Sequence, residues 1–337
     1  MGRAPVQGSD GIEDALLRLL AGHAASATPC ALATVVRTEA PTSAHPGDKA
    51  VITADGTLHG WIGGSCSEPL VRREALLAIA DGLPRLVRIR PDPNVSETRN
   101  GNELTVATTC PSGGALDIFI DPQLPKPMLL VFGGSPAARM LVRLGADLGY
   151  RAVAVHAGGT ASDFPGADQL IDDLAGVSSV PSGAEVWVVV ATMGHYDEEA
   201  LAAALQLGDA DVALVASERR ANAVFAVLRS QGIPEAEIER VRSPAGGTRG
   251  RGGTQEEIAL HALDEIVELR RARLNAARTL QPAAVTGFAT DPVCGMTVDV
   301  SDSRYQREWH GQALHFCCSG CREAFDAEPE RYAAAVH

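Results

Sequence analysis

The residues best suited to chemistry in this sequence are its cysteines, and most of them lie in the C-terminal tail. Four of the seven occur there, in "DPVCGM" and "HFCCSGC": Cys294, Cys317, Cys318 and Cys321. Thiolates are soft, charged ligands, and three or four that converge hold zinc or copper tetrahedrally. Cys317 and Cys321 are four residues apart and would share one side of a helical turn, whereas Cys318 is either the fourth ligand or a free thiol. The sequence therefore predicts a metal site, which His310 or His315 can complete; cysteines that merely pack are the alternative.

Two more cysteines each lie beside a glycine pair. Cys66 follows Gly63 and Gly64 in "HGWIGGSCSEPLVRREA" (59–75), and Cys110 opens "CPSGG". A thiol just before a helix N-terminus tends towards the thiolate, although Glu68 opposes that effect here. Both cysteines are predicted to contact a ligand, with a small buried residue in a tight turn as the alternative. Acyl-type cysteine catalysis needs a histidine base, and the spacing of the nearby histidines identifies none of them as that base.

A third candidate site is the loop in "LLVFGGSPAARMLVRLGADLGYRAVAVH", which is typical of a βαβ unit. Gly133, Gly134 and Ser135 precede a helix whose free N–H groups can take a phosphate, and Ser135 is a good N-cap. A dinucleotide fingerprint would need glycine at positions 135 and 138, and an acid where the second strand ends in His156. The incomplete fingerprint therefore argues against NAD(P) as a cofactor, and an NAD(P)-dependent oxidoreductase is kept as an alternative function.

Two further segments offer polar groups. His195 follows a strand in "ATMGHYDEEAL", at the carboxyl edge where open α/β sheets bind ligands, or it is only a helix-start residue. Arg249 and Arg251 in "SPAGGTRGRGGTQEE" can grip an anion from a glycine-rich loop, or that loop is a plain linker. Both segments are predicted to belong to a cofactor site.

The elements that position these residues fall into three predicted domains. Residues 12–122 read as mixed α+β built on hairpins, with helices around 12–21 and 68–80 and a tight turn at Asp55-Gly56. Residues 127–278 alternate short buried strands with helices, which is typical of a Rossmann-like doubly wound parallel sheet. Residues 279–290 are a linker, and 291–337 form a small Cys-rich module, of a size that often needs a metal to be stable. The predicted fold class is α/β.

Bulk properties limit the function classes. The chain has 337 residues, 45% hydrophobic residues and a formal net charge of −13, which argue against nucleic acid as a partner. The longest apolar stretch, "VWVVVA", is far too short to span a bilayer, and the N-terminus lacks a signal core. We expect a cytoplasmic protein with no membrane span, whose odd number of cysteines fits thiols and metal ligands better than disulfides.

Several of these stretches resemble a known family. "ALATVVRTEAPTSAHPGDKAVITADGTLHGWIGGSCSE" resembles the N-terminal domain of the XdhC/CoxI family, whose Gly-Gly-x-Cys element falls on Gly63, Gly64 and Cys66 and whose second cysteine element falls on Cys110. "LLVFGGSPAARMLVRLGADLGY", "VVVATMGHYDEEAL", "VALVASERRANAV" and "VRSPAGG" resemble the family's Rossmann domain. "DPVCGM", Tyr305, "HFCCSGC" and "EPERY" resemble a YHS domain, a TRASH-like metal-binding module.

The resemblance implies a function. Family members bind the molybdenum cofactor (molybdopterin), protect it, support its sulfuration by a cysteine desulfurase and help insert it into an apo molybdenum hydroxylase such as xanthine or carbon monoxide dehydrogenase. It implies a chaperone rather than an enzyme, with Cys66 as the main contact to the cofactor; a homodimer is one open arrangement. His156 and the appended module depart from the common family plan, and the module suggests zinc or copper binding. Metal delivery or sensing is therefore a further alternative function.

Overall fold

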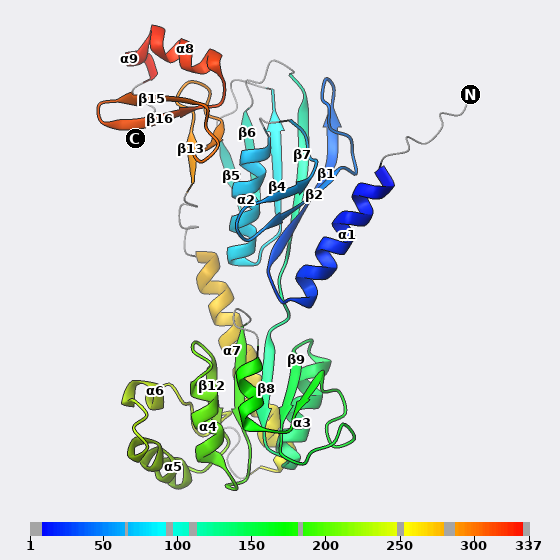
Figure 1. The fold of residues 1–337 in the computed structure, drawn as a ribbon, viewed down its shortest axis with the longest axis vertical. Helices are drawn as coiled ribbons and strands as arrows, with labels where there is room; N and C mark the ends of the chain where they lie inside the picture. The colour runs from blue at the N-terminus through cyan, green and yellow to red at the C-terminus, as the bar shows by residue number, and fades with distance from the viewer. Residues whose placement is uncertain are drawn as a thin grey trace, which may run out of the picture. The chain divides into compact units, whose positions relative to one another are not determined.

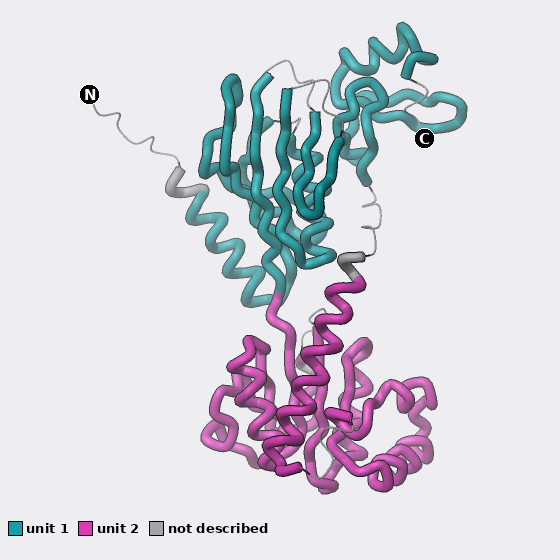
Figure 2. Tube along the Cα trace, turned by 180° about the vertical axis from the view of Figure 1, so that it is seen from behind, with its two compact units in different colours: residues 1–124, 277–337 teal, residues 125–276 magenta. Residues whose placement is uncertain are grey.

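The computed structural model describes residues 9–64, 67–91, 97–107, 113–180, 185–247, 253–279 and 287–332 (Figure 1). Its chain forms two compact units, residues 1–124 with 277–337 and residues 125–276 (Figure 2). The predicted α/β fold class is confirmed in both, as described below. No helix in the described ranges is long and apolar enough to cross a membrane.

The first unit is built on a mixed sheet of seven strands in the order β3-β2-β1-β7-β4-β6-β5. Their bounds are β1 Cys30–Glu39, β2 Lys49–Thr53, β3 Leu58–Gly60, β4 Arg85–Arg90, β5 Thr98–Asn100, β6 Glu103–Ala107 and β7 Ala115–Gln123. The predicted hairpin is present: β2 pairs antiparallel with β3, and Gly56 between them has a φ of +83°, a conformation that glycine adopts without strain. Strand β4 pairs parallel with β6 and antiparallel with β7, so β4 and β6 end at the same end of the sheet, where β7 begins.

Two helices cover opposite faces of this sheet, as alternation along its strands requires. Helix α2 (Glu68–Asp81) buries Leu70, Val71 and Ala75 against the inward-facing residues of β1, β2, β4 and β7. Helix α1 (Ser9–Ala25) packs Leu16 against Cys30 and Val51 on the other face. The glycine pair at 63–64 shortly precedes α2, so the predicted cofactor turn lies just before this helix.

The second unit is a parallel sheet in the order β10-β9-β8-β11-β12. Its elements are β8 Met128–Phe132, α3 Pro136–Asp147, β9 Arg151–Val155, β10 Gln169–Ile171, the 3₁₀ helix η1 Leu174–Ser179, β11 Val186–Val190, α4 Asp197–Leu205, β12 Asp211–Leu214, α5 Glu218–Ser230, α6 Glu235–Glu239 and α7 Gln255–Thr279. Every residue of β8 is buried, because one hydrophobic cluster beneath α4 and α5 and another beneath α3 and α7 cover the two faces of the sheet. This is the doubly wound arrangement that the sequence predicts, and its strand order reverses between β8 and β11.

A small module follows α7 in sequence and groups with the first unit. It consists of two hairpins and two helices: β13 Phe288–Thr290, β14 Thr297–Asp299, β15 Tyr305–Trp309, β16 Gln312–Phe316, α8 Ser319–Ala327 and α9 Pro329–Tyr332. Among its described residues the central hydrophobic cluster is Leu314, Phe316 and Phe325, and Met296 and Val298 are also buried. So small a core gives little stability on its own, which agrees with the expectation of a metal.

Candidate metal centre and cofactor-binding edge

Four side chains of the C-terminal module converge on one point. The ligand atoms of Asp291, Cys294, Cys317 and Cys321 all lie within 4.8 Å of one another. The Cys317 Sγ lies 3.6 Å from the Cys294 Sγ and 3.6 Å from the Cys321 Sγ. The structure thus brings together three of the four predicted cysteines and adds a carboxylate.

Asp291 organises the two loops that carry these cysteines. Its side chain is fully buried; Oδ1 accepts the Val293 N–H at 2.8 Å and Oδ2 accepts the Cys317 N–H at 2.8 Å. The backbone closes the same turn, with the Asp291 N–H donating to the Met296 carbonyl at 2.8 Å. One carboxylate therefore ties the Cys294 turn to the turn between β16 and α8.

The three thiols are electrostatically coupled. A hydrogen bond with Cys317 lowers the pKa of Cys294, whereas the same contact, together with burial, raises the pKa of Cys317 well above its usual range. Burial and the nearby charges of Cys294 and Asp291 also raise the pKa of Cys321. The raised pKa values hold Cys317 and Cys321 as protonated thiols when no cation is present, so binding a metal ion through them would release protons.

The donor set fits a tetrahedral thiophilic ion. Zn–S bonds of about 2.3 Å place sulfur atoms about 3.8 Å apart in a tetrahedron, close to the two 3.6 Å separations. Cys318 is the exposed N-cap residue of α8 and lies outside this group, so its role as a ligand remains a prediction. Neither His310, which is exposed, nor His315, which is buried, belongs to the group. The predicted ligand set did not include Asp291, although its place three residues before Cys294 in "DPVCGM" was a usable clue.

In the second unit, the loop after β8 lies at the carboxyl edge of the sheet, where predicted. Gly133 has a φ of +118°, and a Cβ there would lie 2.4 Å from the Ala191 carbonyl oxygen. Ser135 is the N-cap of α3: its Oγ accepts the Ala138 N–H at 3.0 Å and donates to the Ala191 carbonyl at 2.7 Å. The strand order reverses between β8 and β11. Ser135 directly joins the loop after β8 to the loop after β11, because Ala191 follows β11.

His156 lies over the same loop. A Cβ on Gly134 would be 2.4 Å from the His156 Nε2, and the His156 Nδ1 is 3.2 Å from the hydroxyl of Tyr196. Burial raises the pKa of Tyr196, so this hydroxyl stays protonated. An imidazole therefore lies at the end of the second strand, where dinucleotide-binding folds place an acid.

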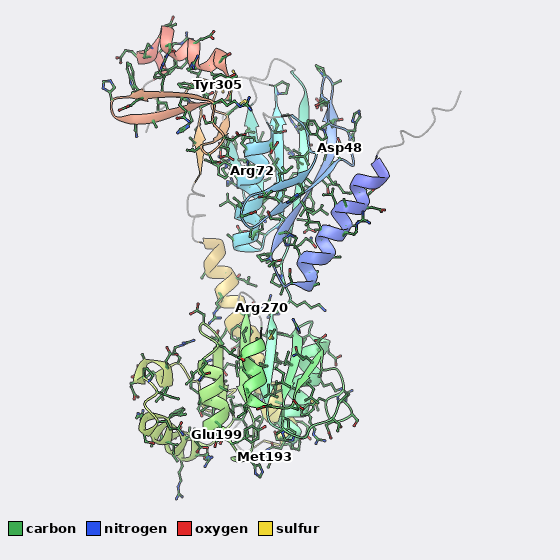
Figure 3. The ribbon with its side chains drawn as sticks, viewed as in Figure 1. Asp48, Arg72, Met193, Glu199, Arg270 and Tyr305 are labelled. Atoms are coloured by element: carbon green, nitrogen blue, oxygen red, sulfur yellow. The ribbon has the colours of Figure 1, made fainter. Side chains whose placement is uncertain are left out.

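The loop after β11 contributes an ionic network that sequence reasoning missed. Asp197 is buried and accepts a hydrogen bond from Thr192 and one from the Arg220 Nε at 3.1 Å. The signal was the acidic run "DEEA" at the start of α4. His195, the predicted residue of this loop, is exposed, as is Met193, which is labelled with Glu199 in Figure 3. Asp197 and Arg220 hold the loop that presents His195.

In the first unit, the glycine pair forms a tight turn. Gly63 has a φ of +119°, and a Cβ there would lie 2.9 Å from the Ser67 Oγ and 3.4 Å from the Leu116 Cδ1. Ser67 is the N-cap residue of α2, but its hydroxyl donates to the Gly64 carbonyl at 2.9 Å instead of capping the helix. Gly63 is buried and Gly64 is exposed, so the turn presents backbone to solvent.

Four predicted cofactor residues, Cys66, Cys110, Arg249 and Arg251, lie outside the described residues. The segments that flank the two cysteines meet the same loop between β1 and β2. A Cβ on Gly63 would lie 3.7 Å from the Ala44 Cβ, and one on Gly114 would lie 2.1 Å from the Pro41 carbonyl oxygen. Asp48, labelled in Figure 3, accepts the His45 N–H at 2.7 Å within this loop. Both cysteine segments therefore leave from one end of the seven-stranded sheet.

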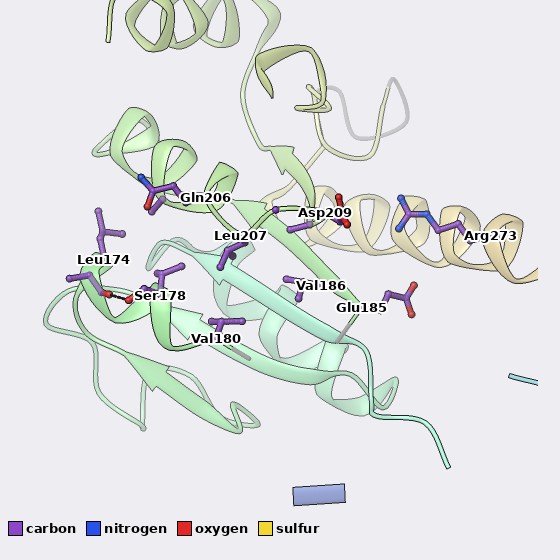
Figure 4. A pocket seen from close by; sticks show the side chains of 14 residues that line it. Leu174, Ser178, Val180, Glu185, Val186, Gln206, Leu207, Asp209 and Arg273 are labelled. Atoms are coloured by element: carbon purple, nitrogen blue, oxygen red, sulfur yellow. Dashed lines mark hydrogen bonds between the residues drawn. The ribbon is translucent and has the colours of Figure 1, made fainter. Parts of the chain in front are cut away.

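The second unit also contains a pocket of about 990 Å³ (Figure 4). Its lining includes Glu185, Val186, Gln206, Asp209 and Arg273. These residues surround the amino ends of β11 and β12, whereas the glycine loop lies at the carboxyl ends. The pocket is therefore separate from the predicted cofactor edge.

Comparisons with protein families match all three parts of the chain. The model described as "XdhC and CoxI family" matches residues 23–90, "XdhC Rossmann domain" matches 129–266 and "YHS domain" matches 289–336.

Two curated proteins are each similar to part of the chain. The uncharacterized protein YqeB of Escherichia coli K12 is 29% identical over 248 residues, 72% of this chain and 44% of its own length. A copper-transporting P-type ATPase of Rhizobium leguminosarum bv. viciae is 46% identical over 55 residues, 16% of this chain and 6% of the ATPase. The chain thus spans less than half the length of either relative.

Among solved structures, one described as a xanthine dehydrogenase from Bacillus halodurans is similar at 18% identity and a TM-score of 0.39, covering 78% of this chain and 96% of that one. The three matched domains, in the order that the sequence motifs predict, carry the assignment. Both large parts of the chain thus match the XdhC and CoxI family, over residues 23–90 and 129–266, and residues 289–336 match a YHS domain.

Proposed function

We propose that this protein is an accessory factor for a molybdenum hydroxylase of the xanthine or carbon monoxide dehydrogenase type. It binds the molybdenum cofactor as cargo, protects it, supports its sulfuration by a cysteine desulfurase and helps to insert it into the apo-enzyme. The observation that carries this proposal is the match of both large domains to the XdhC and CoxI family.

The geometry of the first unit supports a cofactor contact at its cysteine end. Two glycine-flanked segments converge on the loop between β1 and β2, and Gly64 exposes backbone there. Cys66 and Cys110 belong to these segments, and a thiolate is a suitable soft donor to molybdenum. We assign Cys66 as the main contact and Cys110 as a second one.

The second unit would hold a phosphate of the cofactor. The Gly133-Gly134-Ser135 loop precedes the N-terminus of a 12-residue helix, where the helix dipole favours an anion. Arg249 and Arg251 would add charge-assisted hydrogen bonds to the same group, and His195 at the neighbouring loop would contact the cofactor.

The C-terminal module would bind zinc or copper through Cys294, Cys317 and Cys321, with Cys318 as a further predicted ligand. Three thiols and a carboxylate within 4.8 Å of one another are the observation that favours metal binding. The similarity of a 55-residue stretch of the chain to a copper-transporting ATPase supports copper as one of the two ions. Metal delivery to a client is the second candidate function.

Transfer of the cofactor tests the main proposal. The chain is purified from cells that make molybdopterin and incubated with a demolybdated hydroxylase; we expect hydroxylase activity to appear with wild type and to fall strongly with Cys66→Ala. Ser230→Ala is the control, because Ser230 is exposed at the end of α5 and belongs to no proposed site. Equal activation by Cys66→Ala, or none by wild type, argues against the proposal, and tight binding of NADH or NADPH would support an oxidoreductase instead.

A further inference from the structure

The metal module packs against helix α2 of the first domain through an ion pair. Arg72 on α2 places its Nη1 2.6 Å from the Asp299 Oδ2 at the end of β14. The same guanidinium donates from Nε to the Gly56 carbonyl at 2.7 Å, and the Asp299 side chain is only 9% exposed. Arg72 thus joins the β2–β3 turn to the module; it and Tyr305 of the module are labelled in Figure 3.

An apolar contact lies beside this ion pair. Met296 of the module is buried, and with Gly295 and Thr297 it lines a cavity of about 20 Å³ whose other walls are Leu70 of α2, Ile89 of β4, Glu97, and Val106 and Ala107 of β6. So small a cavity indicates close packing. The docking surface is therefore part polar and part apolar.

The docked segment is also the metal-binding turn. Cys294 directly precedes Gly295, and the Gly295 N–H donates to the Asp291 carbonyl at 2.8 Å. Asp291 and Cys294 in this turn belong to the cluster. The next three residues, 295–297, line the cavity against the first domain. The same short turn therefore belongs to both the cluster and the docking surface.

The apolar part of the docking surface lies at the end of the sheet where β4 and β6 end. Strands β4 and β6 end there at Arg90 and Ala107, and β7 begins there at Ala115. Leu70 is four residues after Cys66, and Ala107 is three residues before Cys110. The apolar contact of the module therefore lies at the end of the sheet from which both cysteine segments leave, whereas the Arg72 contact reaches the β2–β3 turn.

We infer that metal binding in the C-terminal cluster and docking of the module onto α2 are energetically coupled. Metal holds the turn in the shape that fits Leu70 and Arg72, and docking in turn holds the ligands together. By thermodynamic reciprocity each process strengthens the other by the same factor. The coupling does not depend on whether the chain carries a molybdenum cofactor.

Docking variants of the full-length chain test this inference by their metal affinity. The variants Arg72→Ala, Arg72→Glu and Met296→Ala loosen the docking surface without removing a ligand. We expect each to weaken Zn²⁺ binding, measured by competition with a chromophoric chelator, by about fivefold or more. Arg37→Asp is the control, because Arg37 forms an exposed pair with Glu39 on the same domain, and it should leave the affinity unchanged.

Hydrogen exchange of the wild type supplies an independent measurement that needs no variant. Adding Zn²⁺ should slow exchange of the amides near Leu70 and Arg72 by about the same factor, and Arg72→Glu should remove that response. Unchanged affinity in the docking variants that remain folded, or exchange in α2 that does not respond to Zn²⁺, overturns the coupling.

Discussion

The imidazole of His156 lies directly over Gly134, so that a Cβ on residue 134 would come within 2.4 Å of the His156 Nε2. This contact explains why glycine is needed at this position of the loop even though the dinucleotide fingerprint is incomplete. The histidine is held from its other side, because its Nδ1 is 3.2 Å from the Tyr196 hydroxyl.

The contact predicts that Gly134→Ala and His156→Ala are coupled. Gly134→Ala alone should destabilise the protein by about 1–3 kcal/mol, because the added methyl overpacks a filled site and displaces the imidazole. In Gly134→Ala/His156→Ala the clash is absent, so the double variant should be more stable than the sum of the single effects predicts. Urea unfolding of the four proteins measures this, and strict additivity would contradict the geometry.

Gly133→Ala should behave differently. Its Cβ would meet the backbone oxygen of Ala191 at 2.4 Å, and its φ is +118°, so no side chain can move aside. We expect a larger loss, about 3 kcal/mol or more, which His156→Ala does not relieve. Rescue of Gly133→Ala by His156→Ala in the same unfolding assay would contradict the close contact between residue 133 and the Ala191 backbone.

Ser135→Ala tests the link between the two loops at the carboxyl edge. It removes the N-cap of α3 and leaves the buried Ala191 carbonyl without the Ser135 hydroxyl, which should cost about 1–2 kcal/mol of stability. Ser217→Ala is the matched control, an exposed N-cap with a longer 3.3 Å contact to the Arg220 N–H, and should cost less. Thermal melts compare the two, and an equal or smaller loss at position 135 would argue against the bridging role.

Asp291→Asn tests whether one carboxylate organises the metal turn. An amide can accept at one of the two positions only, so either Val293 or Cys317 loses its acceptor. Losses of such supporting contacts typically weaken metal binding about 10–100-fold. Chelator competition for Zn²⁺ measures it, with the exposed Asp302→Asn in the same module as control; wild-type affinity in Asp291→Asn would contradict this role.

Cys30 should be chemically inert in the native protein. It is 1% exposed beneath α1, and burial raises the pKa of its thiol, so it stays protonated beyond the usual thiol value of about 8.5. Iodoacetamide at mildly alkaline pH should modify the exposed Cys318 quickly and Cys30 only after unfolding, as peptide mass spectrometry will show. Equal native rates would mean that α1 does not cover this face.

Local patterns in the sequence predicted much of this structure. Buried runs such as "MLLVF" alternating with helices predicted the parallel sheet, and Asp55-Gly56 predicted the β2–β3 hairpin. The bunching of cysteines in the tail predicted a cluster, because ligands close in sequence have little freedom to lie far apart. Each of these features depends on the spacing of residue types within one segment of the sequence.

The features that the sequence did not reveal depend on contacts between distant segments. Arg72 and Asp299 pair across 227 residues, and the hydrophobic pattern of neither segment predicts this contact. The same holds for the parallel pairing of β4 with β6 and for the imidazole of His156 over Gly134. The short strand β10 and the helix η1 were also missed, since three to six residues are too few for a periodic pattern.

The most direct measurement is the amount of molybdopterin that co-purifies with each chain, determined from the fluorescence of its oxidised derivative. The proposed function predicts a near-stoichiometric amount for wild type and for the control Ser230→Ala. It predicts a loss of about tenfold or more for Cys66→Ala, the size of removing one ligand contact worth about 1.4 kcal/mol. Wild type without pterin, or equal pterin in Cys66→Ala and wild type, would contradict it.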